Sequence, residues 1–195
     1  MLKLFHYSTE ELQEPMKSLA RKMHAFAIVI LLIQPIQLIN CLIQISASCE
    51  QLPGYHLIYS LCNLIIWPSL AFFTFSKGFT AICQGPNHGM ALVMFNAATI
   101  VGSLFYLYFI ISGSGAFNGV VKIATLKNCV DAGAKKGALN LSTALCCLEL
   151  FAWTLALILG IHNGLKVKQV YGKHTPIFAA ETEVAAIERK EDDRV

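Results

Sequence analysis

The sequence predicts an all-α membrane protein, a bundle of four transmembrane helices with both termini in the cytoplasm. Of its 195 residues, 55% are hydrophobic and only 14% are charged, and the mean hydropathy is +0.57. Soluble domains average about 25% charged residues. Most of the charges lie in the first 24 and the last 34 residues, with long apolar stretches between them. Such a chain cannot coat a water-facing surface, so we expect neither a soluble enzyme nor a nucleic-acid-binding protein.

Four stretches are long enough to cross a hydrocarbon core about 30 Å thick, which takes about 20 helical residues. We place them at Ala25–Ile45, Leu57–Phe75, Met90–Ile111 and Leu139–Ile161. Each must be a helix, because an open strand would leave its backbone groups unpaired in lipid. Pro35 and Pro68 lie inside the first two spans and are expected to kink them.

Lys and Arg near the span ends predict the orientation. The amino-terminal flank, the second loop and the near part of the tail hold 8 of these residues, whereas the first and third loops together hold 4. Because positively charged loops stay in the cytoplasm, both termini are predicted to be cytoplasmic. No signal peptide is evident, so the first span is expected to remain as an uncleaved anchor.

The two flanks carry weaker signals. Within residues 1–24, Ser8 and Glu11 have capping-box spacing, which is compatible with a short interfacial helix under the membrane or with an ordinary polar flank. Residues 162–195 have mixed charge and few aromatics, so we expect a mobile cytoplasmic tail. Its end, Asp193-Arg194-Val195, resembles the carboxyl termini captured by one class of PDZ domains, which suggests a cytoplasmic scaffold as a partner.

The loops on the other side of the membrane offer one candidate disulfide. Cys49 in the first loop and Cys129 in the third both lie where oxidation is permitted, and a bridge would join the two loops. Seven cysteines are present, so at least one thiol stays free. The third loop, residues 112–138, is the longest and is expected to be the external contact surface.

Glu149 is the one side chain within the predicted spans that is normally ionised at neutral pH, and it lies near the middle of the fourth. An unpaired charge at that depth costs at least about 2.5–3.5 kcal/mol. No Lys or Arg is expected at the same depth, so we predict a neutral, protonated acid. Hydrogen-bond partners are offered by polar stripes on spans one and three, which consist of Gln34, Gln37, Asn40 and Gln44 and of Asn96, Thr99 and Ser103.

Two interpretations of this intramembrane polar network follow. In the structural one, Glu149 bonds to Gln34 or Gln37 and holds the helices in register through interhelical bonds worth about 0.6–2 kcal/mol each. In the other, Glu149 handles a proton or a cation. We favour the structural interpretation, because a transport path normally needs more than one ionisable group and the spans hold no second.

The outline of residues 20–165 resembles the MARVEL-domain group of four-span membrane proteins. The similarity lies in four spans, cytoplasmic ends, a short first loop, Cys129 before the last span, and a last span of mixed small and aromatic residues from Ala144 to Ala156. The resemblance implies a non-catalytic role in organising membrane subdomains, vesicle traffic or cell contacts, in the plasma membrane or a secretory or vesicular membrane.

The sequence therefore predicts a non-enzymatic protein that associates laterally with lipids and with other membrane proteins. It would act as a scaffold, a trafficking or junction factor, or an accessory subunit, with no cofactor and no metal. The alternative is a channel or a proton-coupled transport subunit that uses Glu149. A lipid-modifying enzyme has little support, because no cluster of His, Asp or Cys gathers at one interface.

Overall fold

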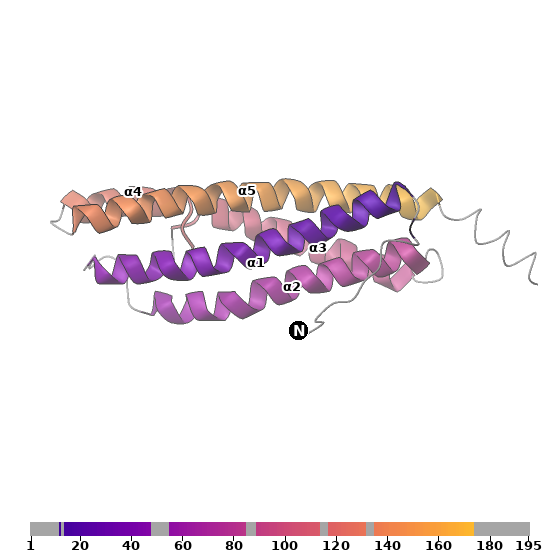
Figure 1. Ribbon diagram of the computed structural model, residues 1–195, viewed down its shortest axis with the longest axis horizontal. Helices are drawn as coiled ribbons and strands as arrows, with labels where there is room; N and C mark the ends of the chain where they lie inside the picture. Colours follow the sequence, from indigo (N-terminus) through magenta and orange to yellow (C-terminus); the bar gives the residue numbers. More distant parts are fainter. Residues whose placement is uncertain are drawn as a thin grey trace, which may run out of the picture.

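The fold was analysed in a computed structural model, which describes residues 12, 14–47, 55–84, 89–113, 117–131 and 135–173. Within these residues the secondary structure is entirely helical (Figure 1). The five helices are α1 (Met16–Ser46), α2 (His56–Gln84), α3 (Gly89–Ile111), α4 (Val120–Asp131) and α5 (Lys136–Lys173).

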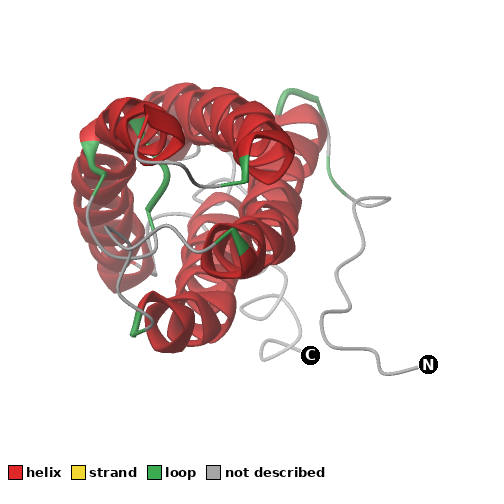
Figure 2. Cartoon of the chain, turned by 90° about the vertical axis from the view of Figure 1, so that its left-hand side faces the viewer, coloured by secondary structure: helices red, strands yellow, loops and turns green. Residues whose placement is uncertain are grey.

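Four of these helices form the bundle. α1 packs against α2 and α5, and α3 closes the ring by packing against the same two helices (Figure 2). α1, α2, α3 and α5 are each long and apolar enough to cross a membrane. The chain is therefore a multi-pass membrane protein with four candidate spans, as its hydropathy predicts.

The spanning helices are longer than predicted. α1 already begins at Met16, so the last part of the amino-terminal flank continues the first span and is not a separate interfacial helix. α5 runs on to Lys173, so residues 162–173 are helical instead of belonging to a tail. Both extensions carry buried apolar residues of one core cluster, Leu19 and Met23 on α1 and Val167 and Val170 on α5. Their mutual burial stabilises helix beyond the lipid-spanning stretch.

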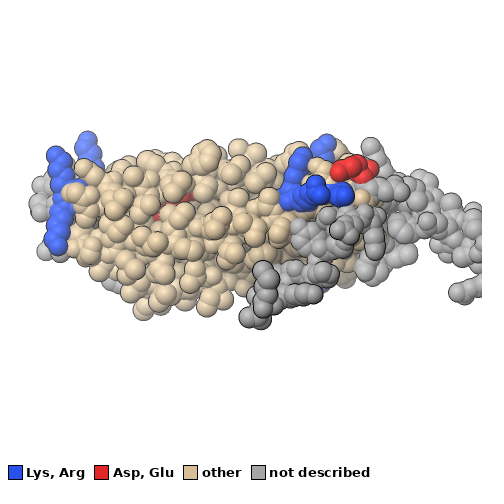
Figure 3. Space-filling view, in the orientation of Figure 1, with Lys and Arg blue, Asp and Glu red and all other residues tan. Residues whose placement is uncertain are grey.

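The two ends of the bundle are basic and the middle is not. α1 begins and α5 ends at the same end of the long axis (Figure 1), as an even number of crossings requires. Lys and Arg gather at both ends, and on this face the extended band between them shows no Lys or Arg (Figure 3). On the exposed surface between them, side chains such as Ile65, Leu104 and Phe151 face outward, as expected for contact with lipid.

The third loop is not a purely external segment. It contains α4, which packs against the first part of α5. Leu126 and Cys129 of α4 are buried in a second core cluster together with Leu139 and Cys146 of α5. The expectation of a contact surface over residues 112–138 is therefore corrected for α4, whose inner face belongs to the bundle.

The link between α3 and α4 packs tightly against the end of α3, and Gly119 permits this close approach. A Cβ added at Gly119 would lie 2.4 Å from the carbonyl oxygens of Phe109 and Ser112 and 2.5 Å from that of Ile110. These atoms belong to the backbone at the end of α3, so they cannot move aside as a flexible side chain does. A larger residue would push α4 away from α3.

We predict that Gly119→Ala destabilises the protein by about 1–3 kcal/mol, because the new methyl group overpacks against fixed carbonyl groups. Gly137→Ala is the matched control, since a Cβ there meets nothing within 4 Å and alanine favours the first turn of α5. Thermal unfolding of the purified protein in detergent measures both variants. Equal unfolding temperatures for the two would contradict the role given to Gly119.

Candidate functional site

The carboxyl group of Glu149 lies inside the bundle with no exposed surface and accepts hydrogen bonds from two other segments. Asn40 on α1 donates from Nδ2 to Oε1 at 3.0 Å. Asn118, in the link before α4, donates from Nδ2 to Oε1 at 2.8 Å and to Oε2 at 2.9 Å. Both carboxyl oxygens are thus satisfied by amide donors, which is the pattern that suits an ionised carboxylate.

A further pair of polar side chains orients these two amides. Ser142 donates from Oγ to Oδ1 of Asn40 at 2.6 Å. Gln44 donates from Nε2 to Oδ1 of Asn118 at 3.1 Å and to Oγ of Ser142 at 3.0 Å. Because each asparagine oxygen is held by a donor, each amide nitrogen is turned toward Glu149. We call this group, with Lys122, the polar cluster; its members are Asn40, Gln44, Asn118, Lys122, Ser142 and Glu149.

Lys122 on α4 brings a positive charge to the carboxylate. Its side chain is only 1% exposed, and it interacts electrostatically with Glu149. The sequence-based argument that no Lys or Arg reaches the depth of Glu149 is therefore wrong, because it counted Lys122 as a loop residue. The predicted neutral, protonated acid stays a prediction, since burial favours the neutral form of Glu149 whereas the two amides and Lys122 favour the charged form.

A layer of aromatic rings lies next to the polar cluster along the bundle. Phe109 is its centre, with its ring centroid 4.7 Å from that of Trp67, 4.9 Å from that of Trp153 and 4.0 Å from that of Phe117. Trp153 lies one helical turn after Glu149 and also stacks on Tyr106 at 5.4 Å. The rings close one side of the cluster with apolar surface, which strengthens the electrostatic interactions inside it.

Of the predicted partners on α1, Asn40 contacts Glu149 directly, whereas Gln34 and Gln37 have other partners. Gln34 donates from Nε2 to the backbone oxygen of Ile30 at 3.2 Å. Gln37 accepts at Oε1 from Nδ2 of Asn63 at 3.3 Å, which ties α1 to α2. The expectation that Gln34 or Gln37 holds the carboxyl group is corrected: the amides that do so lie one turn further along α1 and in the link before α4.

The predicted partners on span three lie elsewhere. Asn96 and Thr99 line a groove between α3 and α5 together with Ser103, Gly164 and Lys168. The hydroxyl oxygen of Thr99 is buried and has no hydrogen-bond partner. Thr99 is therefore not part of a network with Glu149, because its hydroxyl has no hydrogen-bond partner.

Sequence reasoning missed Asn118 and Lys122, although a signal for the latter is present. Lys122, Leu126 and Cys129 recur at i, i+4 and i+7, so a helix over this segment places all three on one buried face. Asn118 lies between Ser-Gly-rich residues and α4, where nothing in the local pattern distinguishes it from an ordinary loop residue.

The predicted disulfide and tail are only partly within the structure. Cys129 is disulfide-bonded, and Cys41, Cys62, Cys83, Cys146 and Cys147 are free. Cys49 lies outside the described residues, so its pairing with Cys129 stays a prediction. Asp193, Arg194 and Val195 also lie outside the described residues.

The polar cluster joins four segments around a buried carboxyl group and can fix their register. Among the described residues, no group of three or more His, Cys, Asp or Glu side chains is placed to hold a metal ion. No family model, curated protein or solved structure matches the chain. The function of the site is therefore inferred from the geometry of the polar cluster alone.

We predict that removing either charge of the pair destabilises the protein more than removing both. Lys122→Gln or Glu149→Gln alone leaves one uncompensated buried charge, which costs about 3–5 kcal/mol. The double variant should lose less than the sum of the two, because no unpaired charge remains. Unfolding in detergent measures the free energies.

Lys127→Gln serves as the control, since Lys127 is exposed on the same helix. It should change the free energy of unfolding by no more than about 0.5 kcal/mol. Strictly additive effects of the two cluster substitutions would show that Lys122 and Glu149 do not act as a pair.

Proposed function

We propose that this protein is a non-enzymatic membrane protein that acts by lateral association with other membrane proteins, as a scaffold, a trafficking or junction factor, or an accessory subunit. The observation that carries the proposal is the groove between α3 and α5, which presents polar side chains on a lipid-facing surface. The orientation with both termini in the cytoplasm, and residence in the plasma membrane or a secretory or vesicular membrane, are part of the same proposal.

The groove combines apolar walls with polar groups. Its walls are exposed apolar residues of the two helices, Ile100, Leu104, Ile161 and Leu165. Asn96 and Ser103 line it as well. A polar side chain that faces lipid lacks a hydrogen-bond partner, and a neighbouring membrane helix can supply one, at about 0.6–2 kcal/mol per bond. The groove is thus suited to receive a helix with a polar residue of its own.

The polar cluster supports an architectural role. Glu149 is fully buried, bonded to two amides and close enough to Lys122 to interact with it electrostatically, so its main effect is to hold α1, α4, α5 and the link before α4 together. A rigid interior of this kind keeps the outer grooves in a fixed shape, which reduces the cost of ordering on association. The MARVEL-like outline and the PDZ-like end of the tail agree with such a role and extend it to cytoplasmic partners.

We predict that Asn96→Leu weakens lateral association by about 3- to 30-fold, which corresponds to the loss of one interhelical bond. Fluorescence energy transfer between labelled copies in lipid vesicles measures association of the chain with itself. Native purification from its own membranes, followed by quantification of co-purifying proteins, measures association with other chains.

The control is Met94→Leu, which changes an exposed apolar residue of α3 for another apolar residue. It should leave association unchanged. A wild-type chain that stays monomeric in vesicles and also purifies without any stoichiometric partner would contradict the proposal.

A second candidate function is that of a proton- or ion-coupled subunit, and two observations favour it. Lys122 provides the second ionisable group that the spans by themselves lack. The chain is also broken between α3 and α4 beside the carboxylate, and broken helices at buried charges occur in transporters.

For this second candidate, the Lys122→Gln and Glu149→Gln double variant is the informative one, because it removes both charges without leaving one unpaired. If Glu149 lies on a conducting path, purified wild-type protein in vesicles should carry a proton current that a pH-sensitive dye detects, and the double variant should lose it. Equal dye responses for wild type, double variant and empty vesicles would exclude this function and leave the architectural one.

A further inference from the structure

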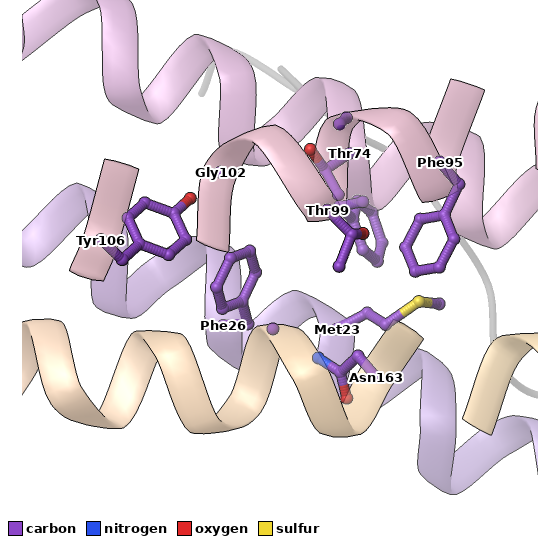
Figure 4. A pocket seen from close by; sticks show the side chains of 11 residues that line it. Met23, Phe26, Thr74, Phe95, Thr99, Gly102, Tyr106 and Asn163 are labelled. Carbon is purple, nitrogen blue, oxygen red and sulfur yellow. The ribbon is translucent and has the colours of Figure 1, made fainter. Parts of the chain in front are cut away.

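A cavity lies between α1, α2, α3 and α5, beyond the aromatic layer from the polar cluster. Figure 4 shows its lining, in which Asn163 of α5 and Thr99 of α3 come from facing helices. Aromatic side chains line much of the remainder, among them Phe26 and Phe95. The cavity is therefore mostly apolar, with a few polar side chains in its lining.

Asn163 is the unusual residue of this lining. Its side chain is only 3% exposed, yet both Nδ2 and Oδ1 lack a hydrogen-bond partner. The hydroxyl oxygen of Thr99, which lines the same cavity, lacks one too. Buried polar side chains in proteins nearly always have partners, and three orphaned atoms on one cavity point to an occupant that supplies them.

The chemistry of these atoms defines the occupant. It must accept a hydrogen bond from the Asn163 amide nitrogen and donate one to the amide oxygen, which a hydroxyl group does with a single oxygen atom. No charged side chain lines the cavity, so nothing there would balance an ion. The space left free is that of about one water molecule, which admits one hydroxyl group and no larger polar head.

We propose that this cavity is a binding site for a single hydroxyl group, held by Asn163 and Thr99. Two sources share this chemistry. One is an ordered water molecule, which is common where buried polar groups lack protein partners. The other is the hydroxyl head of a membrane alcohol such as a sterol. Thr99 also lines the lipid-facing groove between α3 and α5, so a molecule in the membrane lies next to this wall of the cavity.

The first test uses the sign of a stability change. Asn163→Leu keeps the branching and the number of heavy atoms of the side chain and removes both orphaned atoms. If the cavity is empty, the unfolding temperature should rise or stay unchanged, because unsatisfied polar groups are lost. If a hydroxyl group is bound, the temperature should fall by about 2–6 °C, because the bound group loses its partners.

A double-variant cycle with Thr99→Val sharpens this test. When Asn163 and Thr99 hold the same group, the two substitutions together should lower the unfolding temperature by less than the sum of their separate effects. If each side chain acts alone, the changes in unfolding temperature add up. A rise or no change with Asn163→Leu, together with additive effects, overturns the proposal.

A structure of the wild-type chain at a resolution that shows ordered waters keeps the proposal testable even if a variant fails to fold. Density within hydrogen-bond distance of the Asn163 amide supports it, and an empty cavity overturns it.

The two sources are separated by purifying the chain in detergent with and without added cholesterol. A cholesterol-dependent rise in unfolding temperature that Asn163→Leu abolishes assigns the site to a membrane alcohol. No rise, with density for an isolated oxygen, assigns it to water. These outcomes do not depend on lateral association, which is tested at Asn96.

Discussion

The structure depends on how a carboxylate is accommodated inside a membrane bundle. Lipid offers no hydrogen-bond donors, so every partner of Glu149 must come from the protein itself. It receives amide donors from α1 and from the link before α4, and a positive charge from α4. Since these segments are distant in the sequence, satisfying one side chain requires that they meet in a single arrangement. A slip of any helix by one residue would leave a charge or an amide unpaired.

The interior is organised in layers along the bundle as a consequence. The polar cluster lies where α4 packs on the first part of α5, and the rings around Phe109 separate it from the remainder of the core. Beyond the rings lies the cavity of Asn163. The two layers thus differ: the carboxyl group and amides of the polar cluster bond to one another, whereas both amide atoms of Asn163 lack a partner.

This division bears on function. A buried polar cluster around Glu149 and Lys122 restrains the helices and favours a fixed shape, which suits a protein whose outer surface receives other membrane proteins. The same pair of ionisable groups beside a break in the helical path is also a feature of proteins that move ions. Both functions depend on Lys122 and Glu149, but only the movement of ions would require these two side chains to separate. In the architectural function they stay together.

The sequence alone determined the class of protein, because hydropathy acts through local composition: four apolar stretches of span length require four helices in any bilayer. It also singled out Glu149, since a charge is conspicuous within apolar runs, and it included Asn40 in the polar stripe of possible partners. The other partners were decided by tertiary structure. Asn118 and Lys122 belong to a segment with loop-like composition, and only the close approach at Gly119 and the packing of α4 on α5 bring it to the carboxylate. Asn96 and Thr99, by contrast, have the spacing of an inward stripe but face α5 in the half of the bundle away from the carboxylate. Helical periodicity says which residues share a face, whereas the depth at which two faces meet depends on packing between segments distant in the chain.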